Sequence, residues 1–269
     1  NFCTMGAVSD WVNLGDKNRL RAWLLAIGIA IIASHAMQAA GWIDLGESIY
    51  RTPTFSWLGY LLGGFLFGVG MTLASGCGQR TLVRIGSGNL KSLVVLLVLG
   101  FTAYATMRGV LAPIRVVVIG APAVLLSTGD QGIGPLLAGM LGMEDAGALV
   151  WASVVLLGGG LIVYAFASGE FRRSFNNVLA GVVIGLIIPA GWFVTGKIGF
   201  DDFEPVRLES YTFVAPNAES LMYLMTFTGS TISFGVAAVF GVIMGSFLWA
   251  VVTRHFHFEY FPTRSDLER

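Results

Sequence analysis

The chain has 269 residues, of which 55% are hydrophobic and 12% are charged, and its formal net charge is zero. Soluble domains carry about a quarter charged residues, so this composition excludes an ordinary soluble domain. Zero net charge also gives no indication of a nucleic acid or an acidic partner. We therefore expect an integral membrane protein.

Six apolar runs are long enough to cross a bilayer, which takes about 20 helical residues. We expect helices, because an open strand cannot satisfy its backbone in lipid. The predicted spans are Leu20–Ala40, Trp57–Ala74, Leu90–Met107, Ala148–Ala167, Asn176–Thr195 and Ile232–Thr253. Glycines in the second and last runs predict close approach of neighbouring helices; they are Gly63, Gly64, Gly68, Gly70, Gly235, Gly241 and Gly245. The predicted fold class is an all-α, polytopic transmembrane helix bundle.

The distribution of Lys and Arg around these runs favours a cytoplasmic N-terminus, because cytoplasmic segments carry an excess of these residues. Lys17 and Arg19 precede the first run, Arg21 lies at its start, and Arg172 and Arg173 lie between the fourth and fifth. We expect both termini to face the cytoplasm of a bacterium, with the protein in its inner membrane.

One stretch interrupts the apolar pattern. It reads "SGCGQRTLVRIGSGN" and directly follows the second run. Irregular backbone at membrane depth is tolerated only where it is buried in protein or lines a wet cavity. We therefore predict a broken helix whose free N–H groups and positive end face an anion.

A similar order of residues occurs near the N-terminus. Cys3 is followed by Gly15, Asn18, Leu20, Arg21 and an apolar run. Cys77 is followed in the same order by Gly86, Asn89, Leu90, Lys91 and another apolar run. Internal repeats with interrupted helices are typical of transporters whose substrate site lies between the repeats. We expect each of the two cysteines at the end of a short re-entrant helix.

Four interpretations of Cys3 and Cys77 remain open. A disulfide needs Cα atoms within about 7 Å of each other, and a metal site is poorly supported because no CxxC or CxxH motif is present. Either cysteine can instead be a small buried hydrophobe. The fourth interpretation is a pair of thiols lining a path for a sulfur-bearing anion, because sulfur is a weak donor and a soft ligand.

The segment "SGCGQRTLVRIGSGNLKSL" resembles the signature of the YeeE/YedE family of thiosulfate transporters, and "NFCTMGAVSDW" resembles its earlier cysteine segment. The similarity extends to "NNVLAGVVIGLIIPAGWFVTG" and "TFVAPNAESLMYLMTFTG". It implies thiosulfate uptake through a narrow path on which thiols pass the ion along. Family members typically have a third cysteine in a later "GC" segment, which this chain lacks; we expect one membrane domain over residues 1–269, incomplete at both ends.

The predicted substrate-binding residues are Cys3, Gly76, Cys77, Gly78, Gln79, Arg80 and Arg84. A buried dianion needs charge compensation, and Arg80 and Arg84 share a face if their segment is helical. Both arginines can equally be anchors at the membrane surface, and Gln79 can be satisfying its own backbone.

We therefore predict a permease for thiosulfate or a similar small sulfur anion, without catalytic residues, metal or cofactor. Its expected partners are the lipid bilayer and a small cytoplasmic sulfur-carrier protein, and no nucleic acid. The alternative is a membrane sulfurtransferase in which Cys77 is a persulfide-carrying nucleophile. Two nearby arginines would favour a thiolate at Cys77, but neither a histidine nor an acid lies near Cys77 in the sequence to serve as a base.

Overall fold

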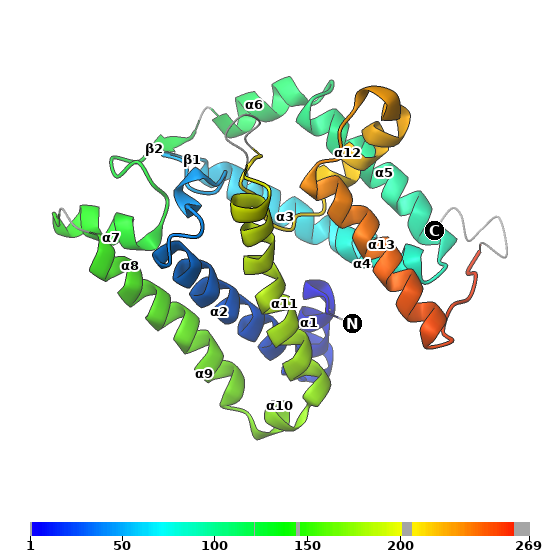
Figure 1. The fold of residues 1–269 in the computed structure, drawn as a ribbon, viewed down its shortest axis with the longest axis horizontal. Helices are drawn as coiled ribbons and strands as arrows, with labels where there is room; N and C mark the ends of the chain where they lie inside the picture. Colours follow the sequence, from blue (N-terminus) through cyan, green and yellow to red (C-terminus); the bar gives the residue numbers. More distant parts are fainter. Residues whose placement is uncertain (1, 121, 144–145, 201–205, 261–269) are drawn as a thin grey trace. The chain divides into compact units, whose positions relative to one another are not determined.

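The computed structural model describes residues 2–120, 122–143, 146–200 and 206–260 (Figure 1). Its regular structure is almost entirely helical. Within these residues the only sheet is a two-stranded antiparallel pair, β1 (Thr54–Phe55) with β2 (Val124–Leu125). The predicted all-α fold class is confirmed.

Six helical segments are long and apolar enough to cross a membrane. They are Asn18–Ala39, Trp57–Gly86, Leu90–Met107, Gly147–Phe166, Phe175–Ile198 and Phe234–Val252. Each of the six predicted runs corresponds to one of them. The second segment includes the glycine-rich break, which divides it into α3 (Trp57–Leu73) and α4 (Gly78–Gly86).

The chain divides into two compact units. Unit 1 comprises Asn1–Leu61 and Pro122–Ser210, and unit 2 comprises Leu62–Ala121 and Tyr211–Arg269. Each unit therefore contains one predicted cysteine segment, Cys3 in unit 1 and Cys77 in unit 2. The two units are described separately below.

Unit 1 is built around α2 (Asn18–Ala39), which packs against α11 (Phe175–Phe193) and α9 (Gly160–Phe166). The close approach of α2 and α11 depends on glycine: a Cβ on Gly181 would lie 2.9 Å from the carbonyl oxygen of Ala22. The other helices of this unit are α1 (Thr4–Ser9), α7 (Ile133–Leu141), α8 (Gly147–Val154) and α10 (Gly169–Arg173).

π-helical and 3-10 turns extend several of these helices. In unit 1 the π-helical turns are Asp10–Leu14, Val155–Gly159 and Val194–Ile198, and a 3-10 turn covers Leu45–Glu47. The first of them continues α1, so the cysteine-bearing helix of unit 1 reaches Leu14.

Unit 2 is built around α4, α5 (Leu90–Met107) and α13 (Phe234–Val252). Its core comprises Leu82, Leu96 and Val239. α12 (Ala215–Met225) packs against α5 and α13. The remaining helices are the rest of α3, α6 (Ala112–Gly120) and a 3-10 turn, Phe227–Gly229.

The expected glycine packing is wrong for most of the glycines that the sequence singled out. Among the described residues, nothing lies within 4 Å of a Cβ built on the four glycines of α3 or on Gly241 and Gly245, whereas one on Gly235 would lie 2.7 Å from Pro216 Cγ. No residue of α3 is buried in the part of the chain that the structure describes. A glycine permits close approach but does not specify a neighbour, and the glycines that make such contacts lie elsewhere, in α11 and α4.

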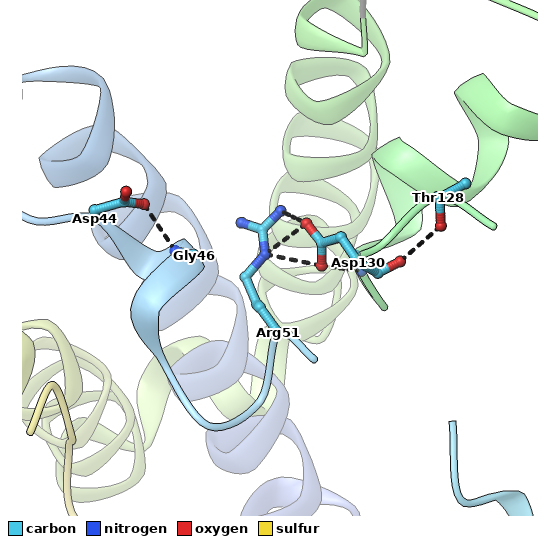
Figure 2. Close-up of polar contacts among 6 residues, drawn as sticks. Asp44, Gly46, Arg51, Thr128 and Asp130 are labelled. Atoms are coloured by element: carbon cyan, nitrogen blue, oxygen red, sulfur yellow. Dashed lines mark hydrogen bonds and ion pairs between the residues drawn. The ribbon is translucent and has the colours of Figure 1, made fainter. Parts of the chain in front are cut away.

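Loops of unit 1 are tied together by an ion pair between Arg51 and Asp130 (Figure 2). The Arg51 guanidinium donates from Nε to both carboxylate oxygens, at 3.1 and 2.9 Å, and from a terminal nitrogen to one of them. The Gly132 N–H donates to Asp130 Oδ1 at 2.8 Å. Burial alone would raise the pKa of Asp130, but the hydrogen bonds from Arg51 and Gly132 outweigh it and lower this pKa. The carboxylate is therefore ionised at neutral pH.

Candidate functional site

Cys77 stands at the N-terminus of α4. After α3 ends at Leu73, Ser75 and Gly76 take positive φ angles of 56° and 156°, and Cys77 returns to extended backbone as the N-cap. The predicted helix break is confirmed. The first intrahelical bond runs from the Thr81 N–H to the Cys77 carbonyl oxygen, at 3.1 Å. The N–H groups of Gly78 and Gln79 precede it and have no acceptor within the helix.

The Cys77 side chain does not cap this helix end. The partial positive charge of a helix N-terminus favours an anion close to these N–H groups. Arg80 adds a full positive charge in the same turn, and its stem folds back over Gly76: a Cβ on Gly76 would lie 2.7 Å from Arg80 Cδ. The break therefore combines a thiol, helix N–H groups and a guanidinium within a few residues.

The N-terminus of α4 approaches α12 closely at Gly78, where there is no room for a side chain. A Cβ added to Gly78 would lie 3.0 Å from Asn217 Nδ2 and 3.1 Å from the carbonyl oxygen of Phe213. Asn217 is 1% exposed. A side chain remote in sequence thus lies at the helix end that carries Cys77.

Cys3 has the corresponding position in unit 1. It is the N-cap of α1, its backbone is extended, and its carbonyl accepts the first intrahelical bond from the Ala7 N–H at 2.9 Å. Its side chain is buried and borders a pocket of about 430 Å³. The pocket is lined by Phe2, Cys3, Arg19, Ala22, Trp23, Ser174, Asn176, Asn177 and Ala180.

Arg19 supplies a cation to the lining of this pocket. A Cβ on Gly6 of α1 would lie 2.9 Å from a terminal nitrogen of Arg19, and the Arg19 Nε lies 3.1 Å from Asp10 Oδ2. An arginine thus lies close to the cysteine-bearing helix in both units, although Arg19 comes from α2 whereas Arg80 belongs to α4 itself.

The internal repeat continues after each cysteine helix. In unit 1, Gly15 has a φ of 72° and Asn18 begins α2; in unit 2, Gly88 has a φ of 101° and Asn89 is the N-cap of α5. Each asparagine donates a hydrogen bond from Nδ2 to a glutamate from a later segment, Asn18 to Glu170 and Asn89 to Glu259. A local structure is thus repeated around the two asparagines, but the sequence matched Gly15 to Gly86, which is the last residue of α4, and not to Gly88.

Arg84 lies at the other end of α4 and lines a second polar pocket, of about 630 Å³. Its neighbours there include Ser75, Thr81, Lys91, His257 and Glu259. The backbone carbonyl of His255 and the carboxylate of Glu259 raise the pKa of His257, and the same contact lowers the pKa of Glu259. The pocket thus contains an acid as well as cations, so its charge is mixed.

The predicted site residues fall into two groups. Gly76, Cys77, Gly78, Gln79 and Arg80 lie together at the N-terminus of α4, with Arg84 in its last turn, whereas Cys3 belongs to unit 1. Sequence reasoning missed the pocket residues around Cys3 and missed Asn217. Asn217 lies in the segment "TFVAPNAESLMYLMTFTG", whose similarity to the family was the one sequence feature that pointed to this residue.

Unit 1 has a further pocket, of about 400 Å³, whose lining includes Ser34, His35, Ser48 and Arg51. His35 Nδ1 lies 2.9 Å from the Ile31 carbonyl oxygen, so the ring is bonded within its own helix. The charge of Arg51 is compensated by its ion pair. Among the described residues its lining includes no cysteine, so this pocket differs in chemistry from the Cys77 helix end.

The whole chain, residues 1–269, matches the family model described as "Sulphur transport". Among curated proteins it is 26% identical to the thiosulfate transporter TsuA of Escherichia coli (strain K12), over 95% of this chain and 71% of that protein. It is 25% identical to the thiosulfate transporter TsuA of Spirochaeta thermophila, over 73% of this chain and 58% of that protein. Together with six helices of membrane-spanning length, these matches identify a multi-pass membrane protein, and the chain belongs to the Sulphur transport (YeeE/YedE) family.

Proposed function

We propose that this protein is a permease that takes up thiosulfate through a path lined by Cys3 and Cys77. The observation that carries the proposal is that both cysteines, one in each unit, are N-caps of short helices with an arginine close by. The names of the two curated relatives supply the substrate.

The chemistry of this arrangement suits thiosulfate. The oxygen atoms of the anion carry negative charge that helix N–H groups and a guanidinium stabilise, while its terminal sulfur accepts a hydrogen bond from a thiol. A thiol is a weak donor, so the ion is held loosely enough to move on. Cys3, Gly76, Cys77, Gly78, Gln79, Arg80 and Arg84 are the proposed substrate-binding residues.

We place the protein in the bacterial inner membrane, with a small cytoplasmic sulfur-carrier protein as the acceptor of the imported sulfur. The proposal can be tested in a bacterial strain that has no other route for thiosulfate uptake and that grows with thiosulfate as its sole sulfur source. Parent protein should support growth. Cys77→Ala should abolish growth and Cys3→Ala should impair it, at matched expression in the membrane.

Serine distinguishes a relay of thiols from simple hydrogen bonding. Cys77→Ser keeps a hydroxyl but loses the soft sulfur, so we expect it not to restore growth. Normal growth with Cys77→Ser would overturn the relay. A persulfide on Cys77 after exposure to thiosulfate, detected by mass spectrometry, would instead favour the sulfurtransferase.

A further inference from the structure

Buried polar side chains without hydrogen bonds are rare, and each one calls for an explanation. Among the described residues, the buried side-chain nitrogen and oxygen atoms without a partner are Trp23 Nε1, Asn217 Nδ2 and Asn217 Oδ1. One of these side chains belongs to each unit. Trp23 lines the pocket that Cys3 borders, and Asn217 lies beside Gly78, the residue after Cys77.

Asn217 is the sharper case. Its side chain is 1% exposed, both of its polar atoms lack partners among the described residues, and Nδ2 lies 3.0 Å from the position of a Cβ on Gly78. Leaving such a buried amide unpaired has a free-energy cost, because the amide has lost its hydrogen bonds to water. A leucine of similar shape would fill the same space without this cost.

The amide lies at the N-terminus of a nine-residue helix, α4, where the N–H groups of Gly78 and Gln79 also have no acceptor within the helix. Donors from two elements that are far apart in sequence therefore meet at one place. Several N–H donors close to a positive helix end match a tetrahedral oxyanion better than they match a cation or an apolar group.

We propose that Asn217 is a substrate-contacting residue: its Nδ2 donates, together with the N–H groups of Gly78 and Gln79, to oxygen atoms of the transported sulfur oxyanion. This inference rests on the proposed function and deepens it. Asn217 holds the oxygen end of the anion and leaves the sulfur end to the Cys77 thiol. It is a specificity-determining residue, because an anion without these oxygens leaves the amide unpaired.

Unit 1 supplies a parallel. Trp23 Nε1 is the other buried side-chain donor without a partner among the described residues. Trp23 lines the pocket that Cys3 borders, and its ring stacks on Phe2 at 4.8 Å between centroids. A buried N–H donor thus accompanies the cysteine in both units.

The test compares Asn217→Leu and Asn217→Asp with the parent in purified protein, by uptake of labelled thiosulfate into proteoliposomes and by the shift in unfolding temperature that thiosulfate causes. Asn217→Leu should be as stable as the parent or more so, but its apparent affinity should fall at least tenfold, about 1.4 kcal/mol, and the thiosulfate-induced shift should shrink. Asn217→Asp places a negative charge beside the anion and should abolish uptake.

The matched control is Ser220→Ala, on the same helix. Ser220 is 5% exposed, and its hydroxyl donates to the Pro216 carbonyl oxygen at 2.7 Å, so its polar atom is already satisfied. We expect its uptake affinity to remain within about twofold of the parent. Asn217→Leu with parental affinity and a parental shift would overturn the inference, whereas failure of the parent protein to take up thiosulfate would overturn the proposed function.

Discussion

Gly78→Ala tests the packing of the Cys77 helix end. The new Cβ would lie 3.0 Å from Asn217 Nδ2 and 3.1 Å from the Phe213 carbonyl oxygen, separations shorter than nearly all Cβ contacts in proteins. Asn217 is buried and the other atom belongs to the backbone, so neither can swing aside. Overpacking of this kind costs about 1–3 kcal/mol, and the higher helix propensity of alanine returns at most about 1 kcal/mol.

The net expectation is a loss of about 1–2 kcal/mol. For a protein of this size each kcal/mol lowers the unfolding temperature by about 2–4 °C, so we expect a decrease of about 2–8 °C, measured by differential scanning fluorimetry in detergent. Uptake of thiosulfate should fall as well, because the amide and the helix end are pushed apart.

Gly70→Ala is the matched control, since nothing lies within 4 Å of a Cβ at this helical position. Its unfolding temperature should equal or exceed that of the parent. If Gly78→Ala were as stable and as active as this control, α12 would not pack against the N-terminus of α4 as described.

Three further predictions concern charge and hydrogen bonding. Arg80→Lys should weaken the apparent affinity for thiosulfate more than tenfold, about 1.4 kcal/mol, because a lysine cannot offer two parallel N–H donors. Parental affinity of this variant in the same uptake assay would show that Arg80 is a membrane anchor. Asp130→Asn should lower stability at pH 7 by about 2 kcal/mol, between the values of exposed and buried ion pairs. Folding lowers the pKa of Asp130, so this contribution to stability is present above the unfolded pKa of about 3.9 and is lost as pH falls through the folded pKa. The unfolding temperatures of parent and variant should therefore converge below about pH 4. A difference that stays constant with pH would contradict this. Trp23→Phe keeps the aromatic ring and removes the N–H, so it should leave stability unchanged and reduce uptake, and unchanged uptake would show that the N–H has no part in transport.

The apolar spans and the helix break were predictable from sequence for different reasons. Twenty apolar residues have few structural options in a bilayer, so the spans follow from composition alone. The break follows from the glycines around Cys77, one of which takes a φ of 156°, a conformation that residues with a Cβ rarely adopt.

The remaining parts of the site depend on tertiary contacts that no local pattern encodes. Asn217 reaches Gly78 only because α12 packs at the end of α4, and nothing in the spacing of residues near Cys77 indicates this neighbour. Arg80 and Arg84 illustrate the same limit. Their spacing places them on one face if the segment is helical, and both lie in α4. The stem of Arg80 nevertheless lies over Gly76, whereas Arg84 lines the pocket that contains Lys91 and Glu259.

The central claim is that the thiol of Cys77 takes part directly in thiosulfate transport. Its most direct test is the initial rate of labelled thiosulfate entry into proteoliposomes that contain equal amounts of parent protein or Cys77→Ser, both with the same unfolding temperature. We predict rapid, saturable entry with the parent and entry no faster than into empty liposomes with Cys77→Ser. Equal rates for the two proteins would contradict the account.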